Sequence, residues 1–206
     1  MRKLSLLICL VGASIFGDGL YTGGKAIVAQ SLMERAWAKT AASGEVHLPW
    51  SWMDAYPAVR LTFGDEKSHI VLNTDSGQAL AFGPAIVSGT QGTDTLAIAA
   101  HKNTQFKTLK DLKQGDIVHL EPPQGEPITY RVTHMDILDS RIDGITIAEA
   151  ATTPSRLALI TCYPFDAVSF NGPMRYVVYA EKVETEPQTN SRAGRSLINP
   201  ALSLPA

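Results

Sequence analysis

Hydrophobic residues in the middle of the chain recur in short runs that predict strands. The runs are apolar or alternate between apolar and polar residues, they are rich in Val, Ile and Tyr, and Gly, Pro, Asp and Asn separate them. The predicted strands span residues 58–63, 69–73, 95–101, 116–121, 128–138, 156–163 and 175–183. Within this part of the chain, only residues 106–112 and 146–153 have a helical pattern. Seven or eight short strands with so little helix predict a mainly β protein that forms a closed or nearly closed barrel.

The N-terminus carries an apolar segment that predicts membrane attachment. Arg2 and Lys3 precede an uncharged stretch at residues 4–17, which ends at Asp18. We expect residues 1–24 to form an uncleaved signal anchor with its basic end in the cytoplasm. A cleaved signal peptide is the alternative, because the uncharged stretch is shorter than the roughly 20 residues of a spanning helix.

Residues 25–57 predict an amphipathic helix followed by a linker rich in Pro and Trp. The apolar stripe of this helix can continue the anchor, lie on the bilayer or pack on the folded domain. That domain is predicted at residues 58–184, and the tail at 185–206 is expected to be disordered. The stripe recurs at i, i+4 spacing and comprises Val28, Ala29, Leu32, Met33, Ala36 and Trp37.

Composition excludes several classes of function. The chain has 206 residues, 45% of them hydrophobic, and a formal net charge of -2, so it can bury a full core and has no electrostatic bias toward nucleic acid. The five histidines are scattered along the chain, without the spacing of a zinc site. We therefore expect no metal, no cofactor and no nucleic-acid partner.

Three residues at the ends of predicted strands carry candidate chemistry. Cys162 ends one apolar run, Arg175 begins the next, and His101 ends a third. A thiol nucleophile, an imidazole acid/base and a guanidinium that stabilises an oxyanion form a layout for acyl transfer through a thioester. Cys162 is the only cysteine beyond the apolar N-terminus, so that part of the chain has no intramolecular disulfide partner for it. The alternative is an inert buried cysteine beside a structural histidine and arginine.

The sequence around these residues resembles the sortases, a family of bacterial cysteine transpeptidases. Residues 159–162 match the last four positions of the family's T-L-x-T-C motif, and Ala158 stands at the first. The family's G-H-R-D-T motif, which an aromatic residue and a short helix follow, is similar to residues 100–106. There, Ala100, Lys102 and Asn103 replace the glycine, arginine and aspartate.

The similarity extends from about residue 59 to about residue 183. The strings TCYPFD and GPMRYVV, at residues 161–166 and 172–178, are most similar to sortases of Gram-negative bacteria. The resemblance implies a closed eight-stranded sortase-type barrel with one or two short helices, preceded by the membrane-anchor helix. It also implies a single-pass protein of the inner membrane with its catalytic domain on the periplasmic side.

By this resemblance, the substrate is a protein with an LPxTG-like sorting signal near its C-terminus. Cys162 would form the thioester, His101 would act as acid/base, and Arg175 would stabilise the oxyanion. Thr161 would contact the substrate and Asn103 would support His101. An amine acceptor, not identified by the sequence, would resolve the thioester. Two alternatives stay open, namely a thiol hydrolase or peptidase that uses water, and a non-catalytic barrel that binds peptides.

Overall fold

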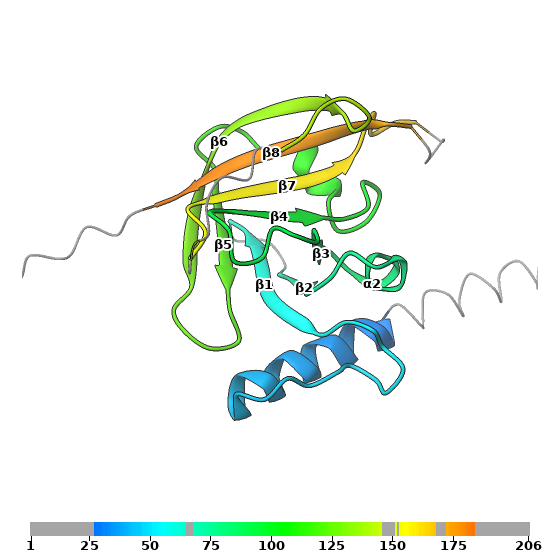
Figure 1. Ribbon diagram of the computed structural model, residues 1–206, viewed down its shortest axis with the longest axis vertical. Helices are drawn as coiled ribbons and strands as arrows, with labels where there is room; N and C mark the ends of the chain where they lie inside the picture. Colours follow the sequence, from blue (N-terminus) through cyan, green and yellow to red (C-terminus); the bar gives the residue numbers. More distant parts are fainter. Residues whose placement is uncertain (1–26, 65–67, 146–150, 152, 168–171, 184–206) are drawn as a thin grey trace, which may run out of the picture.

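Eight strands close into a barrel in the computed structural model, which describes residues 27–64, 68–145, 151, 153–167 and 172–183 (Figure 1). The strand order around the barrel is β1-β2-β3-β4-β7-β8-β6-β5, which confirms the mainly β closed barrel. The strands are β1 (Pro57–Phe63), β2 (His69–Leu72), β3 (Ala85–Ile86), β4 (Thr95–Ala99), β5 (Ile117–Glu121), β6 (Ile128–Asp139), β7 (Arg156–Cys162) and β8 (Met174–Lys182).

Alternation along the strands sorts the apolar residues into two sets. In β7, Leu157 and Leu159 belong to the large core cluster inside the barrel, whereas Ala158 belongs to a smaller cluster on the outer face. The same division holds in β4, where Ile98 faces inward and Ala97 outward. Successive side chains of a strand point to opposite faces, so every second residue lies on the same face. The side of the barrel on which each later residue of β4 and β7 lies can therefore be worked out from these assignments.

The pairing of three strands defines one end of the barrel. β4 and β7 are parallel, with Ala99 aligned to Ile160, and β8 runs antiparallel to β7. The arrowheads of β4 and β7 in Figure 1 therefore point to the end at which β8 begins. Residues that follow β4, end β7 and start β8 meet at this end.

Two elements of the structure were not predicted from the sequence. Helix α2 (Gly77–Phe82) begins after Ser76, whose hydroxyl accepts a hydrogen bond of 3.0 Å from the Ala79 N–H, and β3 has only two residues. Such short elements are below the length at which hydrophobic periodicity is visible. Of the two predicted helices, residues 106–112 contain the 3-10 helix η1 (Lys107–Lys110), and most of 146–153 lies outside the described residues.

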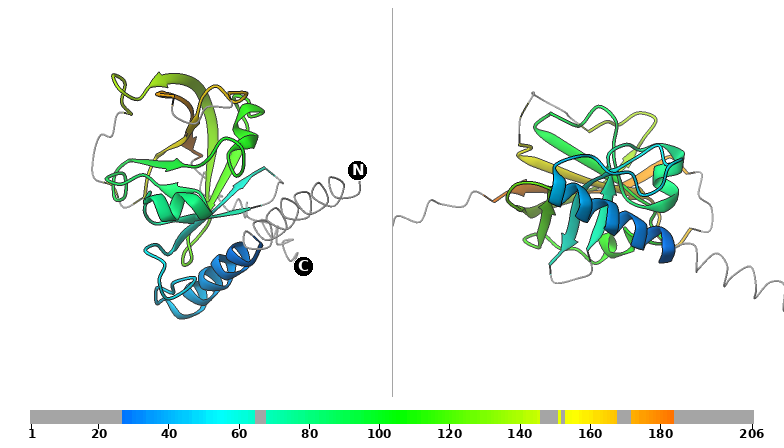
Figure 2. Two further views of the ribbon diagram at one scale, coloured as in Figure 1. Left: turned by 90° about the vertical axis from the view of Figure 1, so that its right-hand side faces the viewer. Right: turned by 90° about the horizontal axis from the view of Figure 1, so that it is seen from below.

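An N-terminal helix, described for residues 27–43, packs along the outside of the barrel (Figure 2). Met33 and Trp37 are buried in a second cluster with barrel residues that include Ile70. Arg60 of β1 donates to Glu34 at 3.0 Å and to Glu121 at 3.1 Å, and its guanidinium lies 3.8 Å from the centre of the Trp37 ring. The structure therefore shows that the apolar stripe of this helix packs on the folded domain, one of the three possibilities that the sequence left open.

Val28 is an exception to the predicted stripe, since its side chain is exposed. The buried face follows Ala29, Met33, Ala36 and Thr40, and Val28 lies about 100° around the helix from Ala29. None of the helices within the described residues is both long and apolar enough to cross a membrane. The predicted anchor (1–24) and the predicted disordered tail (185–206) lie outside those residues.

Candidate active site

His101, Cys162 and Arg175 lie at the same end of the outer barrel face. Cys162 is the last residue of β7 and is aligned with Arg175 on β8. The Ala100 N–H donates to the Ile160 carbonyl at 3.1 Å, so the parallel pairing of β4 and β7 extends past Ala99. Continuing this register brings His101 beside Cys162. Counting in twos from Ala97 and Ala158 places both residues on the outer face.

The three side chains differ in their access to solvent. Cys162 is a free thiol at a half-buried position, Arg175 is also half-buried, and His101 is exposed. The predicted strand 95–101 ends at Ala99, so His101 lies in the loop that follows β4. The site is thus accessible from outside the barrel.

Thr161 links the end of β7 to the residue between β4 and His101. Its side chain is only 2% exposed, and its hydroxyl donates to the Ala100 carbonyl at 2.8 Å. This bond fixes the residue before His101 to the residue before Cys162. Substrate contact by Thr161 stays a prediction.

Bonds to the backbone hold the Arg175 guanidinium at the start of β8. Its Nη1 donates to the Gly172 carbonyl at 2.7 Å and to the Met174 carbonyl at 2.9 Å. Both of these bonds start from Nη1, so among the described residues Nε and Nη2 are left to donate to a bound molecule.

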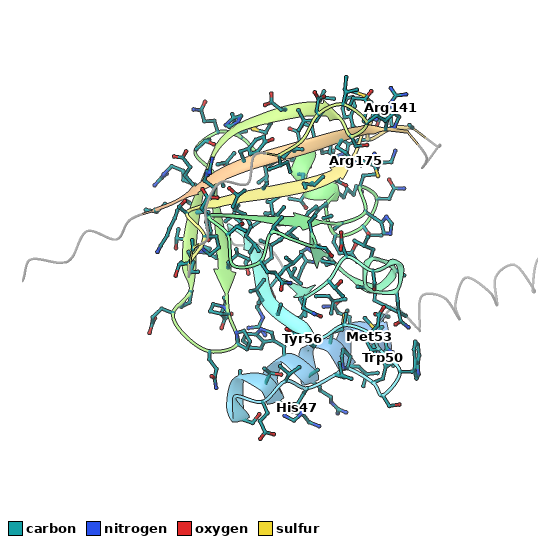
Figure 3. The ribbon with its side chains drawn as sticks, in the orientation of Figure 1. His47, Trp50, Met53, Tyr56, Arg141 and Arg175 are labelled. Atoms are coloured by element: carbon teal, nitrogen blue, oxygen red, sulfur yellow. The ribbon has the colours of Figure 1, made fainter. Side chains whose placement is uncertain are left out.

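A nearby carboxylate is engaged by a different arginine. Figure 3 shows Arg175 and Arg141 near each other at this end of the barrel, and Asp139 of β6 is aligned with Met174. The Arg141 side chain donates to Asp139 through Nε at 2.9 Å and through Nη2 at 2.5 Å. These bonds, with a further one from the Arg141 N–H, lower the pKa of Asp139 to about 2. Asp139 therefore stays ionised at neutral pH and is paired with Arg141.

Lys102 is a feature of the site that the sequence did not reveal. The side chain is 4% exposed, and its ammonium donates to the carbonyls of Pro164 and Ala167, each at 2.7 Å. A buried lysine needs polar partners, and two partners of Lys102 are backbone carbonyls, which no sequence motif marks.

Asn103 was predicted to support His101. Its side chain is exposed, and such support stays a prediction.

The comparison of the sequence with protein families decides the identity of this fold. The sequence model of the Sortase domain family matches residues 64–183, more than half of the chain. The chain belongs to the sortase family. Sortases are cysteine transpeptidases that act on protein substrates with sorting signals, so this chain is a sortase-type transpeptidase.

Solved structures share the fold of this sortase at low sequence identity. Sortase C-1 from Actinomyces oris is 21% identical with a TM-score of 0.53, over 65% of this chain and 77% of the other. A lid mutant of sortase A from Corynebacterium diphtheriae is 17% identical with a TM-score of 0.54, over 79% and 97%. Sortase D5 from Clostridium perfringens is 13% identical with a TM-score of 0.56, over 76% and 96%. No curated protein matches the sequence.

Aromatic side chains position the loop that follows Cys162 in this sortase. The Phe165 ring packs edge-on against Tyr176 with centroids 5.2 Å apart, and the Tyr163 ring lies 6.4 Å from Tyr176. Phe165 and Tyr176 both pack on the large core cluster. Burial, and to a lesser extent the charge of Tyr163, raises the pKa of Tyr176. The start of the β7–β8 loop is therefore fixed to the barrel core.

The outer face beside Cys162 is apolar. Ala97, Ala158 and Val177 are buried there, and partly buried hydrophobic residues that include Ile160 and Leu138 surround them. Farther along β7, a cavity of about 290 Å³ is lined by residues that include Arg156 and Tyr179. The centre of this outer cluster is covered, and Ile160, which faces outward two positions before Cys162, is only partly buried.

Proposed function

We propose that this sortase cleaves a protein at an LPxTG-like sorting signal near the substrate's C-terminus and transfers the N-terminal product to an amine. The observation that carries the proposal is the meeting of His101, Cys162 and Arg175 on one end of the outer face. A nucleophile, an acid/base and an anion stabiliser are the groups that acyl transfer requires. The strings at residues 161–166 and 172–178 support a place among the sortases of Gram-negative bacteria.

The first half of the reaction forms a thioester. The Cys162 thiolate attacks the carbonyl carbon of the sorting-signal threonine, a C–S bond forms, and the carbonyl oxygen becomes an oxyanion. Arg175 donates to this oxyanion from N–H groups that are not engaged by Gly172 and Met174. His101 gives a proton to the leaving amine as the C–N bond breaks. The threonine carbonyl is then held as a thioester on Cys162.

The second half returns the enzyme to its starting state. An incoming amine attacks the thioester and loses a proton to His101, the C–S bond breaks, and an amide and the thiolate are formed. Water in place of the amine would yield a free acid. A membrane anchor at residues 1–24 would keep the barrel at the periplasmic surface of the inner membrane, near exported substrates.

The apolar outer face supports a peptide substrate. An extended peptide beside β7 would place apolar residues of the sorting signal against the partly buried Ile160, with its scissile bond at the end of the strand. Burial of apolar side chains on such a surface provides binding free energy.

The test uses the full chain in detergent with a peptide that contains LPxTG. We expect the parent to cleave after the threonine, to show a thioester by mass spectrometry, and to yield amide in place of free acid when an added amine resolves the thioester in place of water. Cys162→Ala is expected to fold and to lose cleavage, whereas the matched control Cys9→Ala keeps it. Turnover in Cys162→Ala above the rate in buffer would refute the nucleophile. Formation of acid product alone at every amine concentration would favour the hydrolase. A folded parent that neither cleaves the peptide nor reacts rapidly with a thiol reagent would favour the non-catalytic binding barrel.

A further inference from the structure

Lys102 lies between the two loops that carry the reacting groups. It follows His101 in the loop after β4, and its carbonyl partners, Pro164 and Ala167, belong to the loop after β7, which begins just beyond Cys162. The two bonds, each 2.7 Å long, span 62 and 65 positions of sequence. One side chain therefore joins the neighbour of the histidine to the segment that follows the cysteine.

The segments that carry His101 and Cys162 stay connected beyond the end of the strand pairing. At the strand ends, the Ala100 N–H donates to the Ile160 carbonyl, and the Thr161 hydroxyl donates to the Ala100 carbonyl. Beyond them, the Lys102 ammonium bonds carbonyls of the facing loop. The Pro164 end of that loop is held in turn by Phe165, which packs on the core. His101 thus lies on a segment fixed on both sides, by the β4–β7 pairing before it and by Lys102 after it.

The side chain of Lys102 is buried, which is unusual for a lysine. Transfer of an ammonium from water to the protein interior is unfavourable, and hydrogen bonds to two carbonyls offset part of that cost. Methionine has a similar length and would fill the space without desolvation of a charge. What the ammonium adds is direction, because its donors define where two carbonyl groups of the loop after β7 must lie relative to the loop that carries Lys102.

We propose that Lys102 is a positioning residue that holds His101 at its working distance from Cys162. The inference rests on the proposed function of the Cys162–His101 pair. Lys102 itself does not touch the substrate or the reacting atoms. Its role is to keep the imidazole in the place from which it exchanges protons with the thiol and the leaving amine. A displacement of about 1 Å at such a pair can lower a rate roughly 10²-fold.

The experiment compares four full-length chains in a Cys9→Ala background, in which Cys162 is the only thiol. They are the parent, Lys102→Met, His101→Ala, and Lys110→Met as the control at an exposed lysine of η1. Two rates are measured: the pH profile of Cys162 alkylation by iodoacetamide, and acyl-enzyme formation with an LPxTG peptide in a single turnover. Thermal unfolding of each chain verifies that it is folded.

We expect Lys102→Met to remain folded, to form acyl-enzyme roughly 10²-fold more slowly than the parent, and to shift its alkylation profile toward that of His101→Ala. Lys110→Met is expected to match the parent in both measurements. A stabilising role alone would change the melting temperature and leave the alkylation profile of the folded protein unchanged.

Two outcomes separate this inference from the proposed function. In the first, Lys102→Met has the alkylation profile and acylation rate of the parent, whereas His101→Ala differs from the parent. This outcome would overturn the positioning role and leave the catalytic pair intact. A His101→Ala chain that also matches the parent would overturn the catalytic pair itself. If Lys102→Met does not fold, Lys102→Gln, which keeps N–H donors without the charge, takes its place. Failure of both to fold would show a requirement of folding and would overturn the positioning role.

Discussion

Replacement of Thr161 by valine tests the link between the strands that carry the site. Valine has nearly the shape of threonine, so Thr161→Val removes the 2.8 Å bond to the Ala100 carbonyl and leaves the packing nearly unchanged. Ala100 is 7% exposed, so little water can replace the lost donor. A buried acceptor left without its donor costs about 1–3 kcal/mol. For a protein of this size, each kcal/mol lowers the melting temperature by roughly 2–4 °C, so about 2 kcal/mol predicts a decrease of roughly 4–8 °C.

The matched control is Thr161→Ser, which keeps the hydroxyl and loses one buried methyl group, worth about 1 kcal/mol. Calorimetry on the full chains measures the melting temperatures, and single-turnover acylation measures the effect on the site. We expect Thr161→Val to slow acylation more than Thr161→Ser does, because only valine breaks the link between the strands. A valine variant that melts within 1 °C of the parent, roughly the error of the assay, would refute the account of the buried bond. An increase in KM alone, with unchanged melting, would instead favour direct substrate contact by Thr161.

Three further predictions concern Arg175, Tyr130 and Asn103. Arg175→Lys is expected to lower kcat by roughly 10²-fold with little change in melting temperature, because lysine keeps the charge but cannot bond carbonyls and an oxyanion through one planar fork; near-parental kcat would contradict this role. Burial raises the pKa of Tyr130 to about 12, so the neutral phenol stabilises the fold below pH 10 and this stabilisation is lost as the pH rises toward 12. At about 1.4 kcal/mol per pKa unit, the loss is at most roughly 3 kcal/mol; the melting temperature of Tyr130→Phe should fall less steeply than the parent's from about pH 10 to 12, and parallel curves would contradict the prediction. Asn103→Asp, which restores the family's aspartate, is expected to change the pH dependence of acylation without a change in folding, and an unchanged pH profile would argue against support of His101 by this position.

The barrel was predictable because its strands repeat with a period of two. In β7, inward Leu157 and Leu159 alternate with outward Ala158, and a sequence reader can see this pattern without coordinates. The two-residue strand β3 and the six-residue helix α2 carry no such signal, since neither completes enough repeats. The exposure of Val28 has a related cause, because the sequence predicts an apolar stripe but not which part of the stripe contacts the barrel.

The sequence predicted that three candidate residues meet at one end of the barrel, but it did not predict the contacts that hold the segments around them. The sequence marked His101 and Cys162 because each ends an apolar run, and Arg175 because it begins one. The inward position of Thr161 could have been found by counting two residues from Leu159. The position of Lys102 could not, because its partners are carbonyl groups, which every residue has, in a loop of irregular backbone.

The parallel pairing of β4 and β7 explains how distant residues form one site. Two parallel strands end at the same edge, so His101 and Cys162 are reached by moving the same way from the aligned pair Ala99 and Ile160. Had β4 run antiparallel to β7, its C-terminal end would lie beside the start of β7, about 17–20 Å from the thiol at roughly 3.3 Å per residue. The antiparallel partner β8 then contributes its first residues, and Arg175 is aligned with Cys162. Around β7, the parallel neighbour β4 therefore leads His101 to the end at which Cys162 lies, and the antiparallel neighbour β8 begins at that same end with residues that include Arg175.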